Sequence, residues 1–324
     1  MRVASALVVL FGIFGCQLDD EVPVAQDEQA IVGGSEHTGD PAVVLLDLGG
    51  GLCTGTLISP RVVLTAAHCL SGQATSIRAM FVNRMGESGT VINVASYEKK
   101  AGTDLGALTL VSDGPVAPIP ANPYGLDTEI GAAVKIVGFG VTSETGSDSG
   151  IKRMGMASLN ALNGDGIDAG ELTTTNDPQG TCYGDSGGPN FMTIDGMQFV
   201  AGVTSRGTAA CGAGLDVAVR VDSHIGWIRE YIAANDPGEC AADGRCSQNC
   251  ATIDVDCCTA DGMCVEECGA TDPECGIDGG GNNGGGESNV HPNGAGVACN
   301  AGGGAGGGWL AVLLGVALAM RRRH

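Results

Sequence analysis

The chain has 324 residues, with 55 glycines and only 4% aromatic residues, a composition that argues against a helical bundle and favours turns and short strands. Its formal net charge of −21 argues against nucleic acid as a partner because phosphates would be repelled, and we interpret the charge as a solvated acidic surface. Fourteen cysteines are too many for a reducing cytoplasm and predict an oxidising compartment.

Residues 1–16 have the pattern of an export signal. Arg2 is followed by an apolar run, Val3–Phe14, which is too short for a stable membrane span. The end of this segment, Ile13-Phe14-Gly15-Cys16, resembles a bacterial lipobox, which implies lipidation of Cys16 after cleavage. An ordinary signal peptide cleaved nearby is the alternative.

The main body, residues 31–235, predicts an all-β barrel or sandwich. Short apolar runs are separated by turn residues, and several of them alternate in polarity. These runs include Val43–Leu48, Leu52–Ile58, Arg61–Thr65, Ile77–Val82, Ala107–Val111, Val134–Val137, Phe199–Thr204 and Val217–Val221. A helix is expected to close the domain, with Ser223 as its cap and an apolar stripe at Ile225, Ile228 and Ile232.

Residues 240–275 form a tandem repeat of cysteines with the spacing x5, x3, x6. So short a unit has no room for an apolar core, so disulfides are expected to hold it, although their connectivity stays open. The spacing does not match the paired ligands of zinc sites, and no metal site is predicted. The eight cysteines are Cys240, Cys246, Cys250, Cys257, Cys258, Cys264, Cys268 and Cys275.

The rest of the chain is a glycine-rich linker, residues 276–308, followed by residues 309–324. The final segment joins the apolar run Trp309–Met320 to three arginines, Arg321–Arg323. Twelve residues of helix reach only about 18 Å, short of a bilayer core of roughly 30 Å unless the glycines contribute. The arrangement resembles the C-terminal sorting tags of myxobacteria and similar Gram-negative bacteria; a plain C-terminal anchor is the alternative.

Three segments of the body carry groups for nucleophilic catalysis. His68 lies beside Cys69, which is a candidate to bridge Cys53, and Asp104 opens an apolar run. Ser186 lies among glycines, where the backbone can turn sharply and approach a substrate. A hydroxyl needs a neighbouring imidazole as base, and the imidazole needs a carboxylate to fix its tautomer. The sequence therefore predicts a nucleophilic serine hydrolase.

In this order and with these neighbours, the three segments resemble the motifs of the trypsin/chymotrypsin family over residues 31–235. The resemblance implies two six-stranded antiparallel β-barrels with a C-terminal helix, and a Ser-His-Asp triad in the cleft between the barrels. It also implies an oxyanion hole made by the backbone N–H groups of Gly184 and Ser186, and no cofactor.

The resemblance further implies activation by proteolysis. Ile31-Val32-Gly33-Gly34 is similar to the family's freed N-terminus, whose α-ammonium would pair with Asp185 once residues 17–30, the expected pro-segment, are cut away. Ala30 precedes the cut where Arg or Lys is usual, so an activating protease with a preference for small residues is expected.

The substrate pocket departs from the trypsin pattern. Gly180 stands where trypsin-like members have an aspartate, and Asp216 aligns with a second wall position that could attract basic side chains while still admitting apolar ones. Cys182 and Cys211 match the bridge that braces this pocket. The segment Ser205-Arg206-Gly207 matches the edge strand that pairs with substrate, with Arg206 in place of a usual aromatic residue.

The sequence thus predicts an exported, monomeric serine endopeptidase that acts on polypeptides. Its expected location is the surface or outer membrane of a Gram-negative bacterium, or the medium, with attachment through a lipid or a terminal anchor. Two alternatives stay open. One is a catalytically silent adhesion protein with a protease fold, and the other is an esterase that uses the same site.

Overall fold

The computed structural model describes residues 31–163, 167–175 and 179–240. The export signal with Cys16, the pro-segment, the cysteine repeat from residue 241 onward, the glycine-rich linker and the C-terminal tag lie outside the described residues. Within the described part, no helix has the length and apolar character needed to cross a membrane.

The first half of the body is a closed, six-stranded antiparallel barrel with the strand order β2-β3-β4-β7-β6-β5. All residues of β2, β4 and β7 are buried, which explains their continuous apolar sequences, whereas β6 alternates because one face meets solvent. The strands are β2 Val43–Asp47, β3 Leu52–Leu57, β4 Val62–Ala66, β5 Arg78–Phe81, β6 Thr90–Lys99 and β7 Leu105–Leu110.

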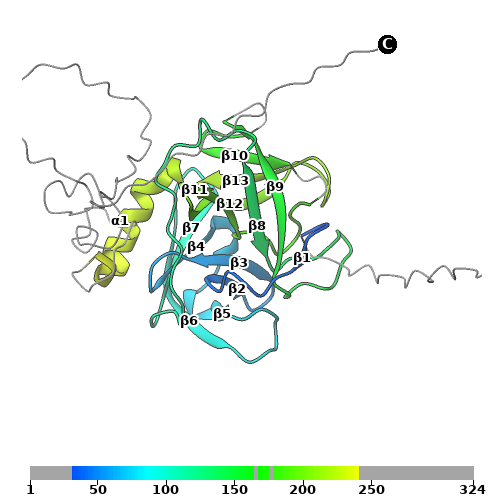
Figure 1. Cartoon of the computed structure of the whole chain (residues 1–324). Coiled ribbons are helices and arrows are strands. Elements are labelled where there is room, and N and C mark those ends of the chain that lie inside the picture. Colours follow the sequence, from blue (N-terminus) through cyan, green and yellow to red (C-terminus); the bar gives the residue numbers. More distant parts are fainter. Residues whose placement is uncertain (1–30, 164–166, 176–178, 241–324) are drawn as a thin grey trace, which may run out of the picture.

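The second half is also antiparallel. Its strands follow the order β9-β10-β13-β12-β11-β8, and an additional β8–β9 pairing closes the six into a second barrel. A two-residue strand, β1 (Ser35–Glu36), is added at β9. The six strands are β8 Ala133–Gly138, β9 Arg153–Leu162, β10 Glu171–Thr175, β11 Pro189–Ile194, β12 Met197–Gly207 and β13 Leu215–Arg220. The predicted pair of six-stranded barrels is therefore confirmed (Figure 1).

Two short helices lie between β4 and β5, and two more lie on either side of the longer helix that closes the body. The 3-10 helices are η1 Ala67–Cys69, η2 Ala74–Ser76, η3 Asp222–His224 and η4 Pro237–Cys240. The α-helix α1 spans Ile225–Asn235 and buries Ile228, Tyr231 and Ile232, which confirms two residues of the predicted stripe; the third, Ile225, is partly buried. The expected cap at Ser223 is wrong, because the residue before the helix is His224, Ser223 belongs to η3, and no side chain caps the first turn.

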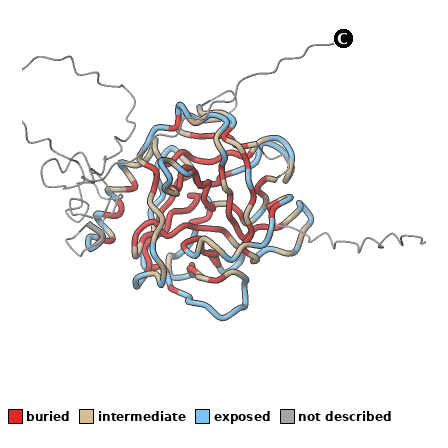
Figure 2. Tube along the Cα trace, in the orientation of Figure 1, coloured by how far each residue is buried: buried red, intermediate tan, exposed pale blue. Residues whose placement is uncertain are grey.

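One apolar cluster joins the two barrels. It contains residues from β2, β4 and β7 of the first barrel, from β8, β11, β12 and β13 of the second, and from α1. Each barrel also has a cluster of its own. Figure 2 shows the buried residues following the strands through the centre of the molecule, with exposed residues gathered on the loops. This shared core fixes the loops of one barrel against those of the other.

Candidate functional site

His68 and Asp104 meet because β4 and β7 are neighbours in the first barrel. Ala66, the last residue of β4, pairs with Leu105, the first residue of β7, so η1 turns directly over Asp104. Asp104 Oδ1 accepts the backbone N–H of His68 at 2.9 Å, and Asp104 Oδ2 lies 2.8 Å from His68 Nδ1. The imidazole side chain is 47% exposed, so this contact orients a ring that still faces solvent.

Asp104 has a third partner that comes from the second barrel. Ser205, in β12, donates its hydroxyl to Asp104 Oδ2 at 2.6 Å and is itself buried. Burial alone would raise the pKa of Asp104, but the hydrogen bonds from His68 and Ser205 outweigh it and hold that pKa below its ordinary value. The carboxylate is therefore ionised at neutral pH and stays fixed against the imidazole.

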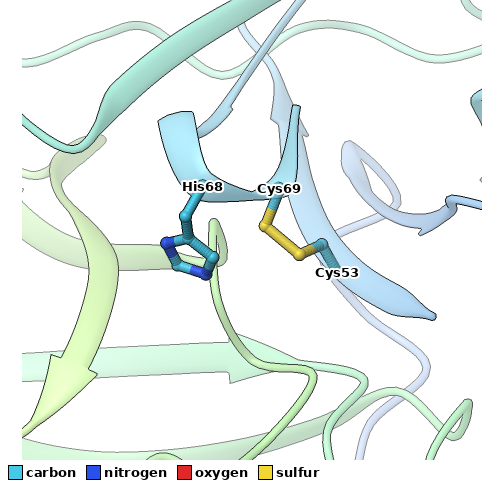
Figure 3. A group of neighbouring side chains, drawn as sticks. All are labelled: Cys53, His68 and Cys69. Atoms are coloured by element: carbon cyan, nitrogen blue, oxygen red, sulfur yellow. A yellow bond between two sulfur atoms is a disulfide. The ribbon is translucent and has the colours of Figure 1, made fainter. Parts of the chain in front are cut away.

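The Cys53–Cys69 disulfide braces the same corner. Cys69 follows His68 on η1 and is bonded to Cys53 on β3, so the imidazole and the disulfide extend from the same turn and lie beside each other (Figure 3). His68 and the two sulfur atoms lie within 4.8 Å of one another, a grouping that would suit a metal if the sulfurs were thiolates. They are joined to each other, so they offer no thiolate ligand.

The loop that carries Ser186 is held to the first barrel by Thr54 on β3. The Thr54 N–H donates to Ser186 O at 2.8 Å, and the Thr54 hydroxyl donates to Gly184 O at 2.9 Å. The same hydroxyl accepts the N–H of Phe139 at 3.2 Å. Ser186 O also lies 3.7 Å from Cys69 Sγ, which brings the serine loop beside the segment that carries His68.

Two glycines give this loop its sharp turn. Gly184 has φ of 101° and Gly187 has φ of 82°, values that side chains rarely allow. The turn also needs space, since a Cβ on Gly187 would lie 2.1 Å from Thr65 Oγ1 and one on Gly184 would lie 2.8 Å from Gly140 Cα.

Two carbonyl groups of this turn, those of Tyr183 and Asp185, accept backbone hydrogen bonds. Tyr183 O accepts the N–H of Val141 at 2.9 Å, and Asp185 O accepts the N–H of Gly188 at 2.8 Å. In a trans peptide the N–H points opposite to the C=O. The N–H groups of Gly184 and Ser186 therefore point away from Val141 and Gly188.

Asp185 is a buried carboxylate beside the serine, with an exposed fraction of 1%. Its oxygens accept the N–H of Gly140 at 2.8 Å and of Cys182 at 2.9 Å. A Cβ on Gly138 or Gly140 would lie within 2.7 Å of the carboxylate, so both glycines make room for it. Burial raises the pKa of Asp185 to about 7, against the lowering effect of the two hydrogen bonds.

Ile31, the first described residue, is buried in the second barrel. Its side chain is fully buried in the apolar cluster of the second barrel, where a Cβ on Gly155 would lie 2.8 Å from it. Ile31 has φ of 46°, and a left-handed conformation is strained for a β-branched residue. The next residue, Val32, forms an isolated bridge with Gly180, whose N–H donates to Val32 O at 3.1 Å.

Of the predicted pocket residues, Ser205 and Gly207 lie on β12 and Asp216 on the neighbouring β13, whereas Gly180 lies outside the strands. Asp216 is buried on β13 opposite Gly207 of β12, and its Oδ2 accepts the N–H of Thr181, the residue after Gly180. Burial raises the pKa of Asp216 despite this hydrogen bond. The Cys182–Cys211 disulfide ties the serine-bearing segment to the loop before β13, as the resemblance implied. Gly180, Gly207 and Asp216 are thus linked through pairing and one hydrogen bond.

Three contacts were absent from the sequence-based prediction: the hydrogen bonds from Thr54 to the serine loop, the Ser205–Asp104 hydrogen bond and the ion pair of Arg206. The guanidinium of Arg206 donates to both oxygens of Glu171 on β10, at 2.5 and 2.8 Å. Each of these contacts joins residues at least 35 positions apart. Only Ser205 and Arg206 had a signal in the sequence, since both belong to the predicted edge-strand segment.

Comparison with known proteins agrees with this geometry. The model of the Trypsin family matches residues 31–228, the segment that forms the two barrels and the start of α1. A trypsin from Saccharopolyspora erythraea is 32% identical over 231 residues, which cover 63% of this chain and 99% of that protein.

Two further relatives come from animals. Brachyurin of Leptuca pugilator is 29% identical over 198 residues, covering 55% of this chain and 86% of that protein. Chymotrypsin-like elastase family member 1 of Canis lupus familiaris is 26% identical over 264 residues, covering 65% and 96%. With its two closed barrels and a family match over most of its length, the chain belongs to the trypsin family of serine proteases.

Proposed function

We propose that this protein is an exported serine endopeptidase that hydrolyses peptide bonds through an acyl-enzyme. In this proposal Ser186 is the nucleophile, His68 the general base and Asp104 the carboxylate that orients His68. The observation that carries the proposal is the 2.8 Å contact between His68 Nδ1 and Asp104 Oδ2, on a ring that remains 47% exposed. Family membership supports a peptidase function in general.

The chemistry follows from the tautomer that Asp104 selects. An ionised Asp104 holds the proton of the neutral ring on Nδ1, which leaves Nε2 as a base. Nε2 takes the Ser186 hydroxyl proton as Oγ attacks the substrate carbonyl, and it then gives that proton to the departing amine. Water repeats the sequence on the acyl-serine, which releases the acid and restores Ser186.

The developing oxyanion needs donors that are already in place. The N–H groups of Gly184 and Ser186 suit this role, since the carbonyls of the same peptide units are bonded to Val141 and Gly188 on the opposite side. Preorganised donors of this kind typically lower the barrier by about 3–4 kcal/mol each.

We also propose that the chain is a zymogen activated by a cut before Ile31. Two observations support this. Asp185 is a buried carboxylate with only backbone N–H groups as its hydrogen-bond donors among the described residues, so a new cation beside it would be strongly favoured. Ile31 is buried with a φ of 46°, a strained value for a β-branched residue. A cut would relieve the strain and supply the ammonium.

For the side chain next to the scissile bond, we propose a pocket that accepts both basic and apolar residues. Asp216 accepts hydrogen bonds from the backbone N–H and from the side chain of Thr181, and its negative charge is what would attract a cation. Burial raises the pKa of Asp216, which favours the neutral, protonated form of its side chain. The attraction of the pocket for basic residues is therefore weaker, and the selection is less strict. Export is supported by the two disulfides. Surface attachment in a Gram-negative bacterium remains our proposal from the terminal segments of the sequence.

The test is active-site labelling of the chain cut before Ile31. We expect an organophosphonate to add covalently in a one-to-one ratio, as read by intact mass, and a peptide library to be cleaved. Ser186→Ala is the matched control because it removes only the hydroxyl oxygen. Labelling that is equal in the control, or no peptide cleavage by the cut enzyme, would overturn the proposal. Ester turnover without peptide cleavage would identify an esterase instead.

A further inference from the structure

Arg206 lies on β12 between two residues that each contact or pair with an acid of the candidate site. Its neighbour Ser205 donates to Asp104 at 2.6 Å, and its other neighbour, Gly207, pairs with Asp216 on β13. A register shift between Thr204 and Arg206 interrupts the β12–β13 ladder at this point. Arg206 therefore stands at the border between the catalytic corner and the pocket.

The backbone at Arg206 lies where an extended peptide can add. The β11–β12 pairing ends at Pro189 and Val203, and among the described residues the bonds from that side reach β12 only as far as Thr204. Strand β12 continues through Gly207 with β13 on its other side. A substrate segment laid along this edge would pass the side chain of Arg206 before it reaches Ser186.

Glu171 holds the guanidinium in one orientation. The pair is bidentate, with Nη1 on Oε1 at 2.5 Å and Nη2 on Oε2 at 2.8 Å. Glu171 also accepts the N–H of Asp168 at 2.8 Å, which fixes the carboxylate in turn. The Glu171 side chain is only 6% exposed, whereas that of Arg206 is 44% exposed. A substrate would therefore meet the guanidinium and not the carboxylate beneath it.

Arginine has five N–H donors, and Glu171 uses two of them. The donors that remain on the exposed side suit a carboxylate, and the fixed fork loses little side-chain entropy when it binds one. The acids around Arg206 oppose such binding through longer-range repulsion. That repulsion is reduced because Glu171 is paired with Arg206 and Asp104 accepts hydrogen bonds from His68 and Ser205.

Resting on the proposed peptidase function, we infer that Arg206 is a specificity-determining residue. With Glu171 as its positioning residue, it selects peptides that carry an acidic side chain two to four residues before the scissile bond. The preference is separate from the pocket at Gly180 and Asp216, so it applies whichever residue enters that pocket.

The experiment uses the full chain cut before Ile31 and peptides that share one sequence around the scissile bond. Glu, Gln or Lys is placed singly at the second, third and fourth residues before that bond. A charge-assisted hydrogen bond predicts a preference for Glu over Gln of about tenfold in kcat/KM at one of these positions, with Lys the poorest. The effect is expected in KM, since the contact is remote from the reacting atoms.

Two variants separate the roles of the pair. Arg206→Gln is expected to abolish the preference for Glu while the Gln peptide is still cleaved. Glu171→Gln keeps the shape but removes the charge that fixes the guanidinium, and the preference should fall with little change in cleavage of the Gln peptide. Arg84→Gln is the control, since Arg84 forms a similar pair with Glu36 away from the site and both its residues are exposed.

The outcomes are distinct. If no peptide is cleaved, the proposed function fails and the inference falls with it. If peptides are cleaved with equal efficiency for Glu, Gln and Lys, or best for Lys, the inference is overturned while the peptidase stands. A preference for Glu that survives in Arg206→Gln would likewise assign the selection to another residue.

Discussion

Asp104 is a partly buried carboxylate that contacts His68, and Asp185 is a fully buried one next to Ser186, yet their pKa values are displaced in opposite directions. At Asp104, hydrogen bonds from His68 and Ser205 overcome burial and keep the pKa low. At Asp185, burial is nearly complete and two backbone N–H groups are not enough, so the pKa is raised to about 7. Asp104 thus has side-chain hydrogen-bond donors, whereas among the described residues Asp185 accepts hydrogen bonds only from backbone N–H groups, and the charge of Arg153 does not offset its burial. In the proposed activation, proteolysis supplies a cation to Asp185 and leaves the surroundings of Asp104 unchanged.

The largest expected effect comes from replacing the Asp104 carboxylate. In the cut enzyme, Asp104→Asn should lower kcat by about 10⁴-fold, because an amide favours the imidazole tautomer with its proton on Nε2, facing the serine. Steady-state peptide hydrolysis measures the loss.

Asp104→Ala provides the comparison, since it removes the orienting group as well as the charge. The midpoint of urea unfolding should change little for Asp104→Asn, which would separate the tautomer effect from misfolding. A loss smaller than tenfold in kcat would contradict the role of Asp104.

The second prediction concerns how the stability contributed by Asp185 depends on pH. In the uncut chain, Asp185 has a pKa of about 7 against an ordinary value of 3.8, so the folded state keeps a proton that the unfolded chain releases. The stability from Asp185 is thus fully present below about pH 4 and is lost as pH rises through 7. A displacement of this size corresponds to on the order of 4 kcal/mol.

Asp185→Asn cannot ionise, so the free energy of unfolding of the variant should gain on that of the wild type as pH rises from 4 to 7. Urea unfolding followed by circular dichroism measures this difference, from which acids common to both proteins cancel. In the chain cut before Ile31 the gain should vanish or reverse, because the new ammonium stabilises ionised Asp185. An identical gain before and after the cut would argue against the Ile31–Asp185 pair.

The smallest expected effect comes from removing the hydrogen bond that Ser205 donates to Asp104. Ser205→Ala removes one of its hydrogen bonds while His68 remains in contact, so kcat should fall by about tenfold. The pKa of Asp104 should rise toward its ordinary value, which would move the loss of activity on the acid side to higher pH. A pH–activity profile of kcat from pH 4 to 8 checks both, with Ser205→Thr as a variant that retains the hydroxyl. An unchanged profile in Ser205→Ala would assign Ser205 to packing alone.

The sequence by itself determined the features that depend on local order. The apolar runs predicted strands such as β2, β4 and β13, and the apolar stripe predicted α1. The glycines around Ser186 predicted a tight turn, because positive φ values exclude most side chains. His68, Asp104 and Ser186 were recognisable because each sits in its own short motif. The helix cap was not, since η3 continues into α1 and displaces Ser223 from the first turn.

Only the tertiary structure decided what surrounds those residues. Thr54 joins the serine loop to the first barrel, Ser205 reaches Asp104 from the second, and Glu171 fixes Arg206, each across a long stretch of sequence. No periodicity or spacing in the sequence predicts such contacts, because they depend on how two closed barrels share one apolar core. The same packing buries Asp185 behind Gly138 and Gly140 and so raises its pKa. Burial and long-range hydrogen bonding, which no local pattern encodes, decided the electrostatics of the site.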